Sequence, residues 1–331
     1  MERRPDQIVR FTDCRVGLIL FGLAEVGLGF LCFCMLALSA WASTLVPAHN
    51  PDQHFSFFLY LALLYAATGG TLVTLGVGSG LCRRWARALN LILSWYSLLI
   101  GLASTVMMGF FLPRISEFQP TPLDHGTLAI VTTCTLVFMG FFMVALPLAG
   151  VLFYGNKNVR ATCEERDPQV RWTDRCPLPV LAASVTLVVK SLLILFGAIL
   201  THGVMFFFGR LVSGSEGMFF ALCICGVWFY AARGLYAMKE SAWWILMLTM
   251  ATWVVCNAIG LSSSDLQEMH RLMGYSAEQV THLQRYSFLS NGTLSLWSVG
   301  YLAPWFGYLV YIKRYLHKPS PFARQELKST D

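Results

Sequence analysis

Apolar side chains fill eight stretches of this chain, and each stretch is about as long as a helix that crosses a bilayer. Roughly 20 apolar residues span the hydrocarbon core when they are helical. Short polar segments separate the stretches and carry most of the charged residues. The predicted spans are residues 16–41, 57–77, 86–112, 128–154, 180–208, 218–238, 242–261 and 289–312. The pattern therefore predicts an all-α, polytopic membrane protein with eight transmembrane helices.

The composition narrows the possible classes of protein. Of the 331 residues, 56% are hydrophobic and 13% are charged, about half the roughly 25% charged share of an average soluble domain. These values exclude a soluble globular enzyme and a disordered chain. The net charge of +6 is spread along the chain, so no nucleic-acid partner is expected. The expected surroundings are the lipid bilayer.

The distribution of Lys and Arg predicts the orientation, because positively charged loops stay in the cytoplasm. With the N-terminus inside, 19 of the 24 Lys and Arg residues lie in inner segments. We expect both termini to be cytoplasmic, in a multi-pass protein of the bacterial inner membrane. The basic inner rim would attract anionic lipid headgroups.

A short motif occurs twice and indicates an internal duplication. Its two copies, 161 residues apart, are Arg10, Phe11, Thr12, Asp13 and Arg171, Trp172, Thr173, Asp174. Pairs of Trp, Pro and Tyr residues also recur at offsets of 158 and 157. Four helices in each copy would make the two repeats parallel. The predicted organisation is a first four-helix repeat over residues 1–160, a second over 161–318, and a cytoplasmic tail over 319–331.

The duplicated motif has a mechanical interpretation and a functional one. In the first, which we favour, the aromatic residue lies at headgroup depth, Thr and Asp cap the start of a helix, and Arg contacts phosphates. In the second, the motif is a docking site on the cytoplasmic side. Both interpretations place the motif at the inner membrane surface.

Two ionisable residues, Glu25 and Lys190, lie clearly within predicted spans. An unpaired charge at this depth costs at least roughly 2.5 to 3.5 kcal/mol, so each charge needs a partner or a wet cavity. Both lie on helix faces rich in small residues, which would allow the first and fifth helices to pack closely. We therefore predict an intramembrane pair of Glu25 with Lys190, either as a bridge that fixes the repeats or as a site of ion coupling.

Thiol and imidazole groups gather toward the outer side of the predicted topology, and both are ligands that copper or zinc prefers. The candidate ligands are Cys32, Cys34, Cys223, Cys225 and His202. The alternative is that cysteine is a small apolar residue that fills gaps between helices. We regard this alternative as the better explanation, and no cofactor is expected.

No motif of a hydrolase or a nucleotide-binding enzyme occurs in the sequence, so an enzyme is not expected. The remaining functions are a duplicated helical-bundle scaffold or assembly partner, working with another membrane protein or as a homo-oligomer, and a secondary transporter or channel for a small solute or metal ion. Transporters usually place several ionisable groups at midplane depth. Because only two such residues are evident here, the sequence favours the scaffold.

Overall fold

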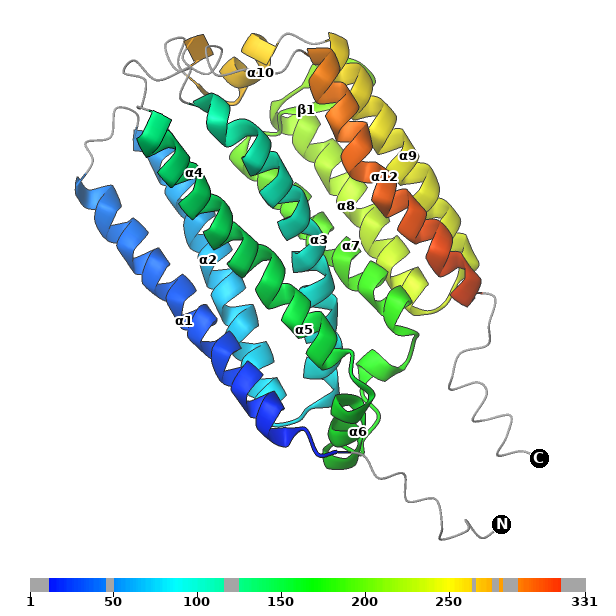
Figure 1. Ribbon diagram of the computed structural model, residues 1–331. Helices are drawn as coiled ribbons and strands as arrows, with labels where there is room; N and C mark the ends of the chain where they lie inside the picture. Colours follow the sequence, from blue (N-terminus) through cyan, green and yellow to red (C-terminus); the bar gives the residue numbers. More distant parts are fainter. Residues whose placement is uncertain are drawn as a thin grey trace, which may run out of the picture. The chain divides into compact units, whose positions relative to one another are not determined.

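The computed structural model describes residues 12–45, 51–115, 125–263, 266–275, 280–281 and 291–316. The chain divides into two compact units. The first comprises residues 1–49 and 58–173, and the second comprises 50–57 and 174–331. The ribbon is shown in Figure 1.

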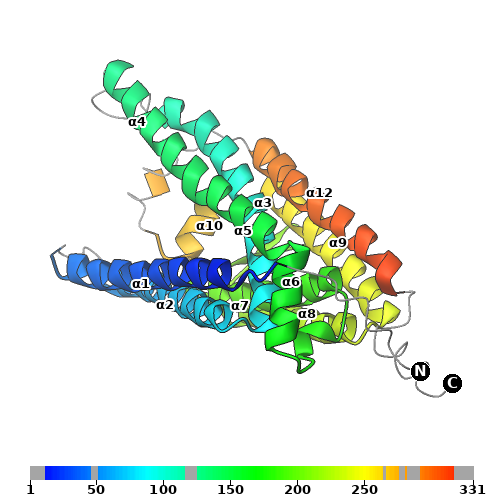
Figure 2. The ribbon, with the colours of Figure 1, turned by 60° about the horizontal axis from the view of Figure 1, so that its bottom comes forward.

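Long helices form nearly all of the first unit. They are α1 (Arg15–Leu45), α2 (Pro51–Gly80), α3 (Arg84–Ile115) and a fourth, composite helix of α4 (His125–Met139), η2 (Gly140–Ala145) and α5 (Leu146–Tyr154). The η2 segment is a π-helical turn that precedes Pro147, which lies in the first turn of α5. A short polar helix, α6 (Lys157–Arg166), follows and lies beside the start of α1 (Figure 2). The apolar periodicity did not predict α6, because this helix lies outside the membrane spans.

The second unit contains α7 (Leu178–Leu200), α8 (Gly214–Tyr236), α9 (Glu240–Ser263), the short α10 (Leu266–Leu272) and α12 (Asn291–Leu316). A two-stranded antiparallel hairpin of β1 (Met205–Phe207) and β2 (Arg210–Val212) connects α7 to α8. The predicted fifth helix, over residues 180–208, is therefore too long. His202 and Gly203 both adopt positive φ angles, which end the helix before the hairpin.

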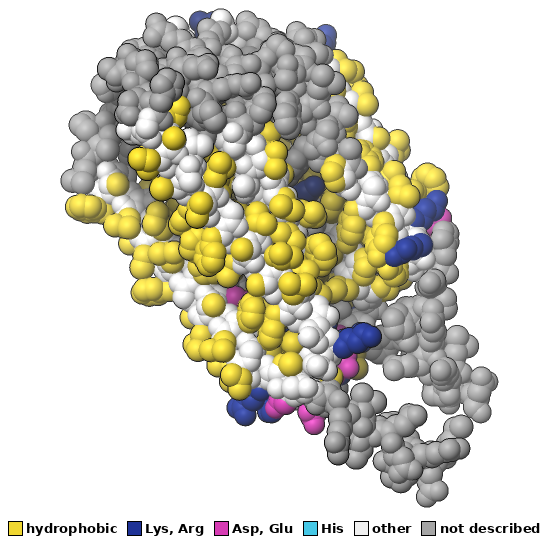
Figure 3. Space-filling model, in the orientation of Figure 1, with side chains coloured by type: hydrophobic (Ala, Val, Ile, Leu, Met, Phe, Trp, Pro, Cys, Tyr) yellow, Lys and Arg dark blue, Asp and Glu magenta, His cyan; other side chains and the backbone are white. Residues whose placement is uncertain are grey.

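Seven helices in the described part of the chain are long and apolar enough to cross a membrane. They coincide with the first seven predicted spans apart from small differences at their ends and the overlong fifth. The eighth predicted span coincides with α12, whose side chains are described from Pro304 onward. Hydrophobic side chains cover much of the described surface seen in Figure 3. The chain is thus a multipass helical membrane protein that also carries a small hairpin.

Each unit contains the same tight turn between two helices. In the first, Cys82 adopts a φ of 54°, and the amide of Arg83 donates to the carbonyl of Gly78. In the second, Met238 adopts a φ of 59°, and the amide of Lys239 donates to the carbonyl of Gly234. Both turns are Schellman motifs with a left-handed residue that is not glycine. They lie 156 residues apart.

Buried positions recur at the same spacing on the helices before these turns. The buried residues of α2 are Gly69, Leu75, Gly76, Gly78 and Ser79, and those of α8 at positions 156 higher are Cys225, Ala231, Ala232, Gly234 and Leu235. After the turns, buried Ala86 and Asn90 of α3 likewise correspond to Ala242 and Leu246 of α9. The two units therefore share a register of buried residues from one helix, through the turn, into the next.

Glycines allow α1 and α2 to approach closely in the first unit. A Cβ atom added to Gly22 would lie 2.5 Å from the carbonyl oxygen of Gly76, and one added to Gly29 would lie 2.8 Å from that of Gly69. In lipid, helices associate through packing and hydrogen bonds, so small residues at a contact determine how near two backbones can come. The α1–α2 contact consequently depends on these glycines.

We expect Gly22→Leu to destabilise the protein by about 1 to 3 kcal/mol, because the larger side chain forces α1 away from α2. Gly27→Leu is the matched control on the same helix, because a Cβ atom at Gly27 has no neighbour within 4 Å. Thermal unfolding in detergent should show a lower midpoint for the first variant only. Equal midpoints for the two variants would contradict the proposed contact.

Candidate functional site

The carboxyl group of Glu25 lies at the centre of a polar cluster in the first unit. Asn90 Nδ2 on α3 donates to Glu25 Oε2 at 2.9 Å, and Tyr154 Oη on α5 donates to Glu25 Oε1 at 2.7 Å. Ser79 Oγ on α2 lies 2.9 Å from Tyr154 Oη and donates to the carbonyl oxygen of Leu18 at 3.2 Å. We call Glu25, Ser79, Asn90 and Tyr154 the Glu25 cluster. It joins all four long helices of the unit.

The predicted partner of Glu25, Lys190, has a different contact within its own unit. Its Nζ lies 4.2 Å from the centre of the Trp305 ring, which joins α7 to α12 through a cation–π interaction. Glu25 and Lys190 are therefore each stabilised by groups in their own unit. Each charge has a partner without a contact between the two residues. The intramembrane pair stays a prediction of the sequence.

The candidate metal ligands differ in burial and in their local contacts. Cys225 is buried, and its Sγ donates to the carbonyl of Ser191 at 3.1 Å, whereas Cys223 on the same helix is exposed. His202 lies in the turn after α7, and Cys32 and Cys34 are half-buried on α1. Within the described ranges, no three His, Cys, Asp or Glu residues form a group that could hold a metal ion. The metal hypothesis thus gains no support from the part of the chain that is described.

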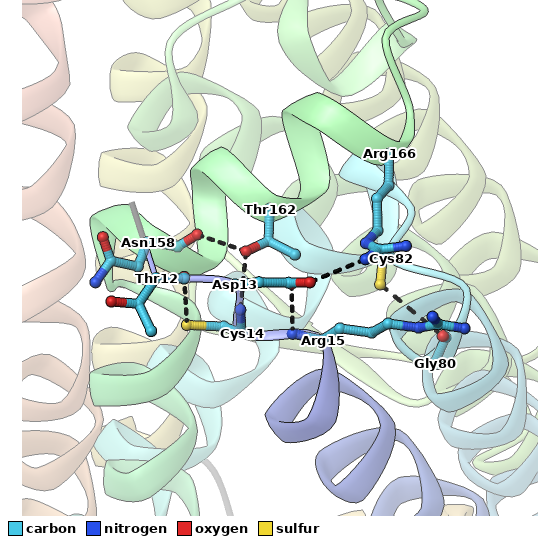
Figure 4. A network of polar contacts seen from close by, with 9 residues as sticks. All are labelled: Thr12, Asp13, Cys14, Arg15, Gly80, Cys82, Asn158, Thr162 and Arg166. Carbon is cyan, nitrogen blue, oxygen red and sulfur yellow. Dashed lines mark hydrogen bonds and ion pairs between the residues drawn. The ribbon is translucent and has the colours of Figure 1, made fainter. Parts of the chain in front are cut away.

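The first copy of the duplicated motif is held by α6 (Figure 4). Arg10 and Phe11 lie outside the described residues. Asp13 Oδ1 accepts a hydrogen bond from the amide of Arg15 at 3.0 Å, at the first residue of α1. Its other oxygen, Oδ2, accepts from Arg166 at 2.9 Å, and the amide of Cys14 donates to Thr162 Oγ1 at 3.1 Å. The contacts fasten the start of α1 to α6.

The second copy has a different role. Trp172, Thr173 and Asp174 form a short 3₁₀ turn, η3, while α7 begins only at Leu178, with Pro177 before it and no side-chain cap. Prolines thus start α7 further along the chain than the predicted cap at Thr173 and Asp174. Arg171 forms a bidentate ion pair with Asp167 at 2.8 and 3.1 Å, and its predicted contact with phosphates stays a prediction.

Asp167 is the most enclosed charge at this end of the first unit, with 2% of its side chain exposed. Besides Arg171, it lies 3.7 Å from Arg83 in the turn between α2 and α3. Hydrogen bonds from Arg171 hold the pKa of Asp167 below its usual value. The Arg166 contact likewise lowers the pKa of exposed Asp13. Both carboxylates are ionised at neutral pH and hold the ends of several helices together.

The buried thiols include Cys82 and Cys163 in the first unit and Cys176 in the second. Burial raises the pKa of Cys163 and of Cys176 to about 12, and it also raises that of Cys82. Because the thiolate is the reactive form, these thiols are inert while the surrounding contacts are intact. Cys163 therefore reports whether α6 stays packed on the rest of the unit.

Asn90, Ser79 and Asp167 were not predicted as members of polar sites. Asn90 was the most visible of them, because it is an amide within an otherwise apolar span. Ser79 and Tyr154 resembled ordinary residues near helix ends, and Asp167 resembled an exposed loop residue. Their shared contacts join segments that are far apart in sequence, so no local spacing reveals them.

We expect Asp167→Asn to loosen this end of the unit by about 1 to 3 kcal/mol, because it removes the charge that accepts hydrogen bonds from Arg171 and pairs with Arg83. The measurement is the rate at which maleimide alkylates Cys163 in purified protein at neutral pH, which should rise several-fold. Glu164→Gln is the matched control, because the Arg160–Glu164 pair is exposed and contributes little. An unchanged rate in Asp167→Asn would contradict the role of Asp167.

The same contact predicts the effect of acid. Because the folded pKa of Asp167 is lowered, its stabilisation is present above the unfolded value, about 3.9, and is lost as the pH falls through the folded value. Unfolding at acidic pH should therefore begin at a higher pH in Asp167→Asn than in the wild-type protein. Circular dichroism during acid titration measures the difference.

Comparison with known proteins assigns no function to these residues. No protein-family model, curated protein or solved structure matches the chain. The features that bear on function are therefore the Glu25 cluster, the ion pairs of Asp13 and Asp167, and the apolar helices that surround them.

Proposed function

We propose that the protein is a duplicated helical-bundle scaffold or assembly partner in a membrane. The main observation in support is that Glu25 and Lys190, the ionisable residues well inside the described spans, each have partners in their own unit. Large apolar side chains face outward. Helices that satisfy their own polar groups can offer these outward faces to lipid or to other membrane helices. The partner is another membrane protein or a second copy of this chain.

The duplication is supported by the matching turns at Cys82 and Met238 and by the shared register of buried residues. Both observations concern positions where close packing restricts the residue type. In our proposal, two parallel four-helix repeats arose from one ancestral unit, and loop changes altered the offset between them.

The proposed location is a bacterial inner membrane with both termini in the cytoplasm, based on the excess of Lys and Arg in alternate loops. Anionic headgroups would contact this basic rim. At the end of α12, the exposed pair of Arg314 with Tyr311, with 3.8 Å between guanidinium and ring centre, is suited to such an interface.

Topology can be tested with introduced cysteines, since Cys163 is too buried to be a useful probe. Gln169 and Arg210 are both exposed, and the proposal places them on opposite sides of the membrane. In intact cells, an impermeant maleimide should label Arg210→Cys and spare Gln169→Cys, and permeabilisation should make both reactive. The reverse pattern would invert the proposed orientation.

The scaffold itself is tested by photocrosslinking in cells. Leu23 and Phe30 on α1 are 63% and 66% exposed, so a photoreactive residue there samples whatever lies against the helix. We expect each to crosslink to one reproducible membrane protein, or to a second copy. Leu18, which is fully buried, is the control position and should give no intermolecular product. Crosslinks only to lipid at both exposed positions would contradict the scaffold.

Transport of a small solute or metal ion is the second candidate function, and the Glu25 cluster is the observation that favours it. A carboxyl group within a span is a common feature of ion-coupled carriers. Purified protein in liposomes should then move a solute in response to a pH gradient, and Glu25→Gln should abolish that movement.

A further inference from the structure

The Glu25 cluster is polar at positions where the second unit is apolar. In the shared register, Ser79 and Asn90 correspond to Leu235 and Leu246, which are fully buried. On the composite fourth helix, buried Val151 and Tyr154 have the same spacing as buried Leu309 and Ile312 of α12. This correspondence of 158 residues is one longer than the offset of the Pro and Tyr pairs in the sequence.

The first helices of the two units, α1 and α7, also share a register of buried residues. Buried Leu18, Gly22 and Gly29 of α1 correspond to buried Val180, Ser184 and Ser191 of α7, 162 residues further on. This register is one residue longer than the offset of the sequence motif, and it places Glu25 opposite Leu187, which is fully buried. Leu187, Leu235, Leu246 and Ile312 belong to one hydrophobic core cluster. A four-helix unit of this kind therefore folds without the polar cluster, so folding alone does not explain the carboxyl group.

Proton counting indicates which form of Glu25 the cluster fits. Three contacts connect four oxygens in series, from Glu25 Oε1 to Tyr154 Oη, to Ser79 Oγ and to the carbonyl of Leu18, at 2.7, 2.9 and 3.2 Å. Each contact needs one proton, and the two hydroxyl groups supply only two. An ionised Glu25 leaves one contact without a proton. A protonated Glu25 supplies the third proton and reverses the hydrogen bond from Tyr154. Glu25 then donates to Tyr154, which donates to Ser79, which donates to Leu18.

The remaining contacts agree with a neutral carboxyl group. Asn90 donates to the other oxygen, Oε2, which serves as the carbonyl oxygen of the acid. Among the described residues, the groups that face Glu25 are Asn90 from α3, Tyr154 from α5 and the backbone of Gly76 from α2, and none is cationic. An uncompensated carboxylate in a span is costly, whereas a protonated one is satisfied here.

We propose that Glu25 is a reversible proton-binding site, whose protonated form is held by the Tyr154 and Ser79 hydroxyl groups. The series runs along α1 from Glu25 back to Leu18, seven residues or about 10 Å, toward the end where Asp13 and Arg166 form their ion pair. When the proton leaves to water, the O–H bond of the carboxyl group breaks and its electron pair stays on Glu25 as a carboxylate. Tyr154 then turns its hydroxyl group from Ser79 to that carboxylate.

Infrared spectroscopy of the purified, full-length protein tests the site. At pH 7 the wild-type protein should show the C=O band of a protonated carboxyl group, shifted in D₂O, and Glu25→Gln should lose it. Glutamine is a close match for the neutral acid, because its amide can donate to Tyr154 in the same way. If Glu25→Gln fails to fold, Glu25→Leu, which copies Leu187 of the second unit, replaces it.

The folding equilibrium gives a second readout. If the folded protein holds one proton that an exposed glutamate releases, raising the pH weakens folding by at most about tenfold in the equilibrium constant per pH unit. This dependence should be present in the wild-type protein above the ordinary pKa of an exposed glutamate, about 4.3, and absent in Glu25→Gln. Tyr154→Phe should retain the carboxyl band at a shifted frequency, because the carboxyl group loses the hydroxyl oxygen that accepts its hydrogen bond.

Three results would overturn the proposal. They are the absence of the carboxyl band in folded wild-type protein at pH 7, a band that persists in a folded Glu25 variant, and an ionised Glu25 paired with Lys190. Each of these results leaves the scaffold proposal intact, because the crosslinks from α1 do not depend on protonation. A failure of those crosslinks would likewise not contradict the proton-binding site.

Discussion

The first unit depends on one carboxyl group that must find its hydrogen-bond partners without water. Within a bilayer, a polar side chain is stable only when neighbouring helices satisfy it. Glu25 on α1 meets this requirement through Asn90 on α3 and Tyr154 on α5, and Tyr154 in turn meets Ser79 on α2. One group thereby fixes the relative depth and rotation of four helices. The nearby glycine contacts between α1 and α2 let the helices come close enough for these bonds to form.

The two units show two solutions to the same packing problem. The second fills its centre with Leu187, Leu235, Leu246 and Ile312, and the first fills the corresponding positions with a hydrogen-bonded series. Replacement of a buried polar network by apolar side chains is often neutral or stabilising. A polar network that persists beside an apolar counterpart is therefore better explained by an activity, such as holding a proton, than by stability.

Charge is used differently at the membrane boundary, where water is available. Asp13 and Asp167 join α1, α6 and the turn between α2 and α3 through arginines. These pairs hold helix ends that the apolar core does not reach. Two residues of the repeated motif, Asp13 and Arg171, contribute to this task. The first copy of the motif caps a helix, whereas the second copy anchors a loop.

The sequence by itself determined the membrane class, the positions of seven spans and the presence of a charged residue in α1 and in α7. These features follow from local hydrophobicity, which any stretch of about 20 residues displays without its neighbours. Only the tertiary structure decided that Glu25 meets Asn90 and Tyr154, that Lys190 meets Trp305, and that Arg171 binds Asp167. It also ended α7 before the hairpin and revealed α6. Such contacts depend on helix rotation and depth, and those are set by the packing of segments that lie far apart in the chain.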